Sequence, residues 1–279
     1  MLSPLPTEPL RAHHAEEFFA ERVRALVESR CGYSPRPAAR PLLVAAIARH
    51  RAGRSFEAYW EVINDPRNGA AELQGLVEDM LNHETVCGRN PPHFEALALR
   101  VLPELRRFDR PVRIASLGCS TGEEVYSLAI TAAETYGVAG GPVVEIAGLD
   151  LSARVLAVAR AGLYRPASLR ELTPVQRELG FVPHPDGFQV RPSVARHTRF
   201  LQHNLMDPLP LVGLDVVFCR NVLIYFNIAS ARRVLANIRD ALAPGGWLFL
   251  GPSESALHLR DWFEPVPCAE TMLYRRRPS

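Results

Sequence analysis

The sequence contains no lysine, and all 32 of its Lys and Arg positions are arginine. A phosphate-binding loop of the Walker type needs a lysine beside its glycines, so that kind of nucleotide site is excluded. The 30 acidic residues leave a formal net charge of only +2, far from the large excess of proteins that coat nucleic acid. Nucleic acid is therefore not an expected partner.

Long apolar runs and paired cysteines are missing as well. The longest uniformly apolar stretch, 42–48, is much shorter than the about 20 residues that a membrane-spanning helix needs. The 5 cysteines form no C-x-x-C pair, and their odd number does not suggest a disulfide framework. No metal-ligand spacing is visible, so no metal is expected. These absences predict a cytoplasmic protein without direct membrane insertion.

The spacing of apolar residues changes near residue 110. The first hundred residues show apolar side chains at helical spacing, interrupted by glycine and proline. Beyond them, short apolar stretches alternate with amphipathic helices, a pattern typical of a doubly wound parallel sheet. The expected strands are 112–117, 143–149, 214–219 and 247–250, and the expected helices are 123–135, 152–160 and 228–242.

The stretch from Phe181 to Phe200 breaks this alternation. Its apolar residues surround Pro185-Asp186-Gly187 and predict small antiparallel strands, among them 198–201. We interpret the stretch as an inserted β subdomain, about 179–200.

The most informative motif follows the first predicted strand, where Gly118 and Gly122 enclose Cys-Ser-Thr. Glycines there let the backbone approach a ligand, and the next helix presents its N-terminal amides. The three-glycine dinucleotide fingerprint is absent. The loop suits the amino-acid part of S-adenosylmethionine, although a tight turn that packs helix on strand explains it equally well. Asp150 ends the next strand, either as an acceptor for ribose hydroxyls or as part of a helix cap.

The same glycines match Gly-x-Ser-x-Gly, which would make Ser120 the nucleophile of a serine hydrolase. That elbow normally follows several strands and an upstream oxyanion loop. Here the upstream chain is helical and has no His-Gly-Gly run. The hydrolase is therefore the less favoured alternative.

Several motifs in order give a more specific indication. The run 118–127 resembles the cofactor loop of the chemotaxis-receptor glutamate O-methyltransferases, the CheR type. Other segments resemble the same family over about residues 15 to 276. They are 55–59, Thr85-x-x-x-Arg89, 149–156, 161–165, Asn204-Leu205, 218–226, 242–249 and 251–254.

The resemblance implies an α/β protein with a helical N-terminal domain and a Rossmann-like class I methyltransferase domain that carries a small antiparallel β insertion. The expected limits are 1–90 for the helical domain, 91–110 for a linker helix and 111–279 for the methyltransferase domain. The implied activity is S-adenosylmethionine-dependent methylation of glutamate side chains on a chemoreceptor or a similar coiled-coil signalling protein.

The resemblance also implies site residues. Arg89 would clamp the acceptor carboxylate and Tyr225 would lie near the transferred methyl group. Ordinary structural roles are the alternative: Glu124 could compensate a helix dipole, Asn221 could be a turn residue at a strand end, and Tyr225 could pack in the core. The expected cofactor-binding residues are His83, Thr85, Arg89, Gly118, Glu124, Asp150, Asn204, Leu205, Asn221 and Val222.

The sequence departs from the family pattern near this site. Cys87 and Gly88 stand where two aromatic residues are usual, His83 where asparagine is frequent, and Pro252 where histidine is common. A signalling or binding module with impaired catalysis is therefore an alternative.

A basic segment suggests a partner surface on the helical domain. No acidic residue lies between its arginines before Glu57. The arginines could dock on acidic receptor helices, although a solvated helix face is the ordinary interpretation. They are Arg36, Arg40, Arg49, Arg51 and Arg54.

Overall fold

The computed structural model describes residues 8–34, 39–81, 83–107, 109–137, 141–268 and 270–278. The chain divides into two compact units. One comprises Met1–Asn82 with Tyr225–Ala231, and the other His83–Ile224 with Arg232–Ser279. This division does not test the predicted domain limits 1–90, 91–110 and 111–279, which stay predictions.

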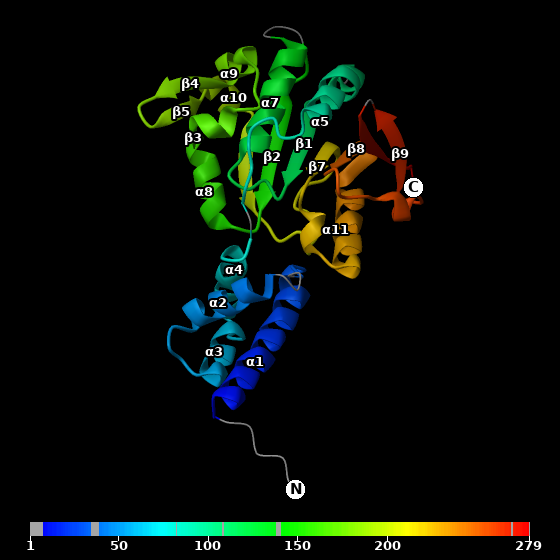
Figure 1. Cartoon of the computed structure of the whole chain (residues 1–279). Helices are drawn as coiled ribbons and strands as arrows, with labels where there is room; N and C mark the ends of the chain where they lie inside the picture. Colours follow the sequence, from blue (N-terminus) through cyan, green and yellow to red (C-terminus); the bar gives the residue numbers. More distant parts are fainter. Residues whose placement is uncertain are drawn as a thin grey trace. The chain divides into compact units, whose positions relative to one another are not determined.

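The first unit is helical (Figure 1). Its helices are α1 Glu8–Cys31, α2 Arg40–Arg51, α3 Phe56–Ile63 and α4 Gly69–Glu78. Ser55 caps α3 by accepting a hydrogen bond from the Ala58 N–H, and Phe19 of α1 stacks on Phe56 at 4.8 Å between ring centroids. These contacts explain the helical spacing of apolar residues in the sequence.

A distant segment completes this unit. The backbone N–H of Ser34 donates to the carbonyl of Tyr225 at 2.7 Å, and Tyr33 forms an isolated β-bridge with Phe226. The segment Tyr225–Ala231, a few residues after the strand 214–219, thus belongs with the N-terminal helices.

The second unit is built on a seven-stranded sheet in the order β6-β2-β1-β7-β8-β10-β9 (Figure 1). The first five strands in that order run parallel, and β10 and β9 add an antiparallel hairpin. The bounds are β1 Val112–Leu117, β2 Val144–Asp150, β6 Thr198–Gln202, β7 Leu214–Cys219, β8 Leu242–Leu250, β9 Phe263–Cys268 and β10 Thr271–Arg276. The predicted α/β fold is confirmed.

Helices follow the parallel strands and bury their apolar faces. α7 (Glu123–Tyr136) packs on β1 and β2, and α8 (Ala153–Ala161) on β2 and β6, while α11 spans Ile228–Ala241. The predicted helix before β1 consists of α5 Pro91–Ala96, a π-helical turn η2 Leu97–Val101, and α6 Leu102–Leu105. Short helices complete the unit: η3 Pro166–Leu169, α9 Pro174–Gly180, α10 Pro192–Ala195, η4 Leu223–Tyr225 and η5 Leu257–Leu259.

A separate three-stranded sheet contains β3 (Leu163–Tyr164), β5 (Gly187–Val190) and β4 (Phe181–His184). The hairpin around Gly187 agrees with the sequence prediction. The placement of 198–201 in this subdomain was wrong, because β6 pairs in parallel with β2 at the edge of the main sheet. Strand propensity does not specify which neighbour a strand takes.

Among the described residues, no helix combines the length and the apolar character needed to cross a membrane.

Candidate active site

The carboxyl ends of the central strands bring the predicted cofactor residues to one edge of the sheet. β1 leads into Gly118, β2 ends at Asp150, and β7 leads through Arg220 into Asn221. The chain passes from β1 to β2 on one side and places β7 on the other, so strand order reverses at β1. In open α/β sheets, such a switch point is where ligands bind.

The glycine turn after β1 is tightly packed. Gly118 has φ +67°, and a Cβ atom there would lie 2.5 Å from Cγ2 of Val222. Gly122 has φ +93°, and its Cβ would lie 2.8 Å from the Cβ of Ala159. Both positions therefore require glycine, for their φ angle and for lack of space.

Asp150 fastens this turn to the next helix. One carboxylate oxygen accepts from the Ser120 N–H at 2.8 Å and the other from the Ser152 N–H at 2.9 Å. Ser152 in turn caps α8. The structural role of Asp150 is thus visible, and its role in binding ribose hydroxyls stays a prediction.

Ser120 has the positive φ, +50°, that a strained nucleophile would also have. Its hydroxyl, however, donates to the backbone carbonyl of His83 at 3.0 Å. A serine nucleophile needs a base that accepts its proton, and a carbonyl oxygen cannot act as one. The geometry therefore does not favour the hydrolase.

Glu124 lies in the first turn of α7 and has both carboxylate oxygens engaged. Oε1 accepts from the Ser116 hydroxyl at 2.8 Å, and Oε2 from Nη1 of Arg220 at 2.9 Å. Neither partner was predicted from the sequence. An arginine directly after a strand that is apolar except for Asp215 is a signal that could have identified Arg220.

Glu123, the neighbour of Glu124, is only 3% exposed. Its oxygens accept from the Thr121 hydroxyl at 2.6 Å and from the Ser168 hydroxyl at 3.3 Å. Burial raises the pKa of the Glu123 carboxyl above its ordinary value, and these hydrogen bonds oppose the shift. Glu123 thus joins the glycine turn, through Thr121, to the segment that contains Ser168.

The segment before α5 carries the predicted N-terminal contacts. Thr85 is half-buried, and Arg89 donates from Nη1 to the carbonyl of Glu84 at 2.9 Å. The unusual Cys87 and Gly88 are both buried. Their backbone N–H groups donate to the Ser168 carbonyl at 2.8 Å and to the Ser127 hydroxyl at 2.9 Å, and Gly88 has φ +74°.

The remaining predicted residues lie on other loops. Asn221 has φ +58°, and a carboxylate oxygen of Glu254 accepts from its backbone N–H at 2.8 Å. Asn204 accepts from the Met206 N–H through Oδ1 at 3.1 Å, after the end of β6. Buried Leu205 follows it. Tyr225 is described with the helical unit, where its ring centroid lies 6.0 Å from that of Tyr33.

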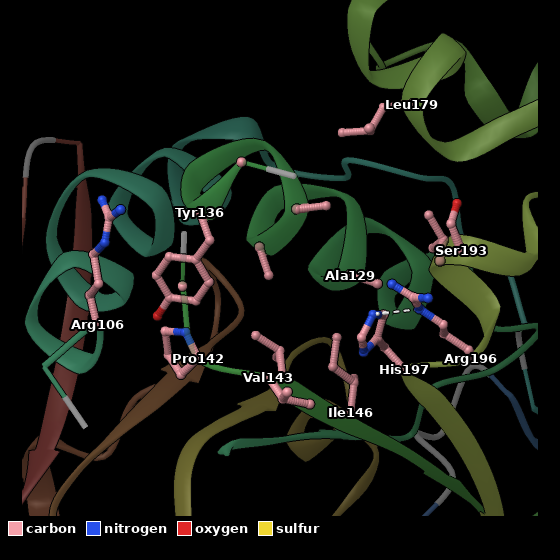
Figure 2. Close-up of a pocket in the computed structure, with 16 residues that line it drawn as sticks. Arg106, Ala129, Tyr136, Pro142, Val143, Ile146, Leu179, Ser193, Arg196 and His197 are labelled. Atoms are coloured by element: carbon pink, nitrogen blue, oxygen red, sulfur yellow. Dashed lines mark hydrogen bonds between the residues drawn. The ribbon is translucent and has the colours of Figure 1, made fainter. Parts of the chain in front are cut away.

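A groove of about 930 Å³ in the same unit lies elsewhere (Figure 2). Tyr136 and Pro142 lie at one end and Arg196 and His197 at the other, and the Arg196 Nε atom donates to the His197 ring at 3.1 Å. The groove contains none of the predicted site residues. Its size alone therefore does not make it the active site.

Comparisons with known proteins show the family of the chain. The family model described as CheR methyltransferase, SAM binding domain, matches residues 83–272. A chemotaxis protein methyltransferase of Vibrio parahaemolyticus is 41% identical over 204 residues, 71% of this chain and 74% of the relative. One of Escherichia coli is 31% identical over 250 residues, 87% of this chain and 86% of the relative.

Among solved structures, magnesium protoporphyrin IX methyltransferase from Synechocystis with bound SAM covers 84% of this chain and 96% of its own, at 17% identity and a TM-score of 0.40. The family model covers more than half of the chain, and the relatives exceed 30% identity. The chain therefore belongs to the CheR family of S-adenosylmethionine-dependent methyltransferases.

Proposed function

We propose that this methyltransferase forms methyl esters on glutamate side chains of a chemoreceptor or a related coiled-coil signalling protein. The methyltransferase class and its connection with chemotaxis follow from the family and the names of its relatives. The acceptor residue and the receptor are the proposed part. The observation that carries the proposal is the meeting of Gly118, Glu124 and Asp150 at the switch point of the sheet, within the matched residues.

The residues present fit S-adenosylmethionine. The close-packed glycine turn permits backbone approach, and Asp150 and Glu124 supply fixed carboxylates that suit hydroxyl and ammonium donors. When bound, the cofactor supplies a sulfonium methyl group, whose transfer to a carboxylate oxygen yields a methyl ester and S-adenosylhomocysteine. Asn204, Leu205, Asn221 and Val222 would complete the cofactor site, with His83 and Thr85 on the N-terminal side.

The protein needs no general base for this reaction, because a glutamate side chain is ionised at neutral pH. Its contribution is to align the acceptor and to exclude water, which together can account for much of the barrier reduction. Arg89 would hold the acceptor, since a guanidinium forms a bidentate pair of hydrogen bonds with a carboxylate. Tyr225 would lie near the transferred methyl group.

Methyl transfer to a chemoreceptor signalling fragment tests the proposal. Radiolabelled S-adenosylmethionine should label the fragment, and mild alkali should release the label as volatile methanol, as an ester requires. A matched fragment with glutamine at the methylation positions should stay unlabelled. Label that resists alkali, or that persists on the glutamine fragment, would contradict glutamate as the acceptor. Binding of S-adenosylhomocysteine without any transfer would instead indicate the non-catalytic module.

We further propose that arginines of α2 and the turn after it attract the receptor. Arg40 and Arg49 already pair with Glu17 at 3.5 Å and Asp79 at 3.0 Å, and Arg36 lies outside the described residues. The guanidinium of Arg51 covers the Phe56 ring at 4.7 Å. Exposed Arg54 completes the set.

Charge reversal tests this docking surface. Arg49→Glu and Arg54→Glu should raise the KM for the receptor fragment and leave the KM for the cofactor unchanged, with a smaller effect at high salt. Arg67→Glu, another exposed arginine of the helical unit, is the control. Equal effects of all three substitutions would contradict a specific surface.

A further inference from the structure

One buried guanidinium joins three segments of the candidate site. The Arg220 side chain, at the end of β7, is 1% exposed. Its Nη1 donates to Oε2 of Glu124 at 2.9 Å, in the first turn of α7. Its Nη2 donates to Oδ1 of Asn90 at 2.7 Å and to the backbone carbonyl of Arg89. A single side chain thus links β7, α7 and the segment before α5.

Stability alone does not account for this arginine. Burying an ion pair removes two charges from water, and apolar side chains of similar volume often stabilise a fold as well or better. The Nε atom of Arg220 is buried and, among the described residues, has no hydrogen-bond partner. The guanidinium lies instead 5.5 Å from the Phe94 ring centroid. A costly group in a site is better explained by what it orients.

The groups that Arg220 holds are those on which methyl transfer would depend. Glu124 is an expected cofactor residue, and its second oxygen is fixed by the Ser116 hydroxyl, so the carboxylate has one orientation. The Arg89–Asn90 peptide carries the expected carboxylate clamp. Asn90 has φ +60°, an uncommon conformation outside glycine that needs support from its surroundings.

We propose that Arg220 is a positioning residue for methyl transfer, which fixes the Arg89–Asn90 peptide relative to the Glu124 carboxylate without touching cofactor or acceptor itself. This role rests on the proposed function. Only an arginine can perform it, because the planar fork presents two nitrogens in fixed directions, whereas a lysine presents a single point charge.

Arg220→Lys is the central test, because it keeps the charge and removes the fork. We expect kcat per cofactor-binding site, counted by calorimetry with S-adenosylhomocysteine, to fall about tenfold or more, since small misplacements of reacting groups cost rate steeply. The affinity for S-adenosylhomocysteine should also fall through Glu124. This calorimetric arm needs no acceptor. If the wild-type protein binds S-adenosylhomocysteine but transfers no methyl group, the proposed function is contradicted. The effect of Arg220→Lys on the affinity for S-adenosylhomocysteine still supports or overturns the role of Arg220.

The matched control is Arg110→Lys. Arg110 also uses both terminal nitrogens of its guanidinium, which donate to the Asp215 carboxylate at 2.8 and 2.6 Å, near the opposite end of β7. We expect it to leave kcat and cofactor affinity within about twofold of wild type, because its fork holds no group of the site.

A second variant separates orientation from folding. Asn90→Gly removes one acceptor of Arg220 while suiting φ +60°. It should lower kcat by about threefold alone and add little to Arg220→Lys, as coupled residues do in a double-mutant cycle. Additive effects would overturn the proposal. The proposal would also be overturned if fewer molecules bound S-adenosylhomocysteine while kcat per binding site stayed unchanged.

Discussion

The carboxylate of Glu254 accepts a hydrogen bond from the backbone N–H of Val222 at 2.8 Å, across 32 residues of chain. The same carboxylate accepts from the N–H groups of Asn221 at 2.8 Å, Leu223 at 2.7 Å and Gly251 at 2.7 Å. It thereby gives hydrogen-bond partners to the turn after β7, much as an anion does at a helix N-terminus. The loop that carries two expected cofactor residues depends on one acidic side chain.

Glu254→Gln should therefore destabilise the protein. An amide has one acceptor oxygen where the carboxylate has two, so some of these N–H groups lose their partner. We expect the free energy of unfolding in urea to fall by about 2 kcal/mol. Glu264→Gln, at an exposed position of β9, should change it little. Equal stability of the two variants would contradict the role of Glu254.

Arg89→Ala should abolish methyl transfer and preserve the fold. The substitution removes the expected carboxylate clamp, and we expect kcat/KM for the acceptor to fall by about a hundredfold or more. Arg107→Ala is the control, because the Arg107 side chain is 71% exposed. Circular dichroism and thermal unfolding should match wild type. Unchanged turnover would exclude Arg89 from the mechanism.

His93 should make stability depend on pH. It is 3% exposed, and burial, together with the nearby charge of Arg220, lowers its pKa to about 4 from the ordinary 6.5. The folded state therefore favours the neutral ring, while the unfolded chain binds a proton near pH 6.5. As pH falls from 6.5 to 4, this residue should remove up to about 3 kcal/mol of unfolding free energy.

The measurement compares urea unfolding across this pH range for wild type and two variants. His93→Gln should flatten the pH dependence, whatever its effect on stability at neutral pH. His184→Gln, at an exposed position, should retain it. A slope unchanged by His93→Gln would show that other groups cause the dependence.

The cysteines should differ in reactivity. Cys87, Cys119 and Cys219 are buried, and burial raises the pKa of all three thiols, whereas Cys31 and Cys268 are half-buried. Thiolate is the reactive form of cysteine. An aromatic disulfide reagent should therefore modify Cys31 and Cys268 quickly, and the three buried cysteines only after unfolding. Cys31→Ser with Cys268→Ser should remove the fast phase. Fast labelling that persists in that double variant would contradict the buried placement.

Much of the sheet could be predicted because its strands are short, apolar and separated by helices. The predicted strand 214–219 matches β7, and 112–117 matches β1. The assignment of 198–201 failed because partner choice depends on distant residues. The β9–β10 hairpin was not predicted, because Phe263–Cys268 contains two prolines, which weaken a strand pattern.

The candidate site could be predicted only in part. Residues next to glycines and at strand ends, such as Gly118 and Asp150, follow from local patterns. Arg220 and Glu254 were within quoted motifs but received no role, because their partners lie far away in sequence and only folding brings them together. Binding of the cofactor by the predicted residues stays a prediction.

The return of Tyr225–Ala231 to the N-terminal helices has a practical consequence for dissecting the gene. A single cut after codon 82 would give a leading fragment without the carbonyl that receives the Ser34 amide. The trailing fragment would contain Tyr225–Ala231 without the N-terminal helices against which this stretch packs. Separate production of the two halves will therefore require co-expression, or a graft that returns this stretch to the leading fragment.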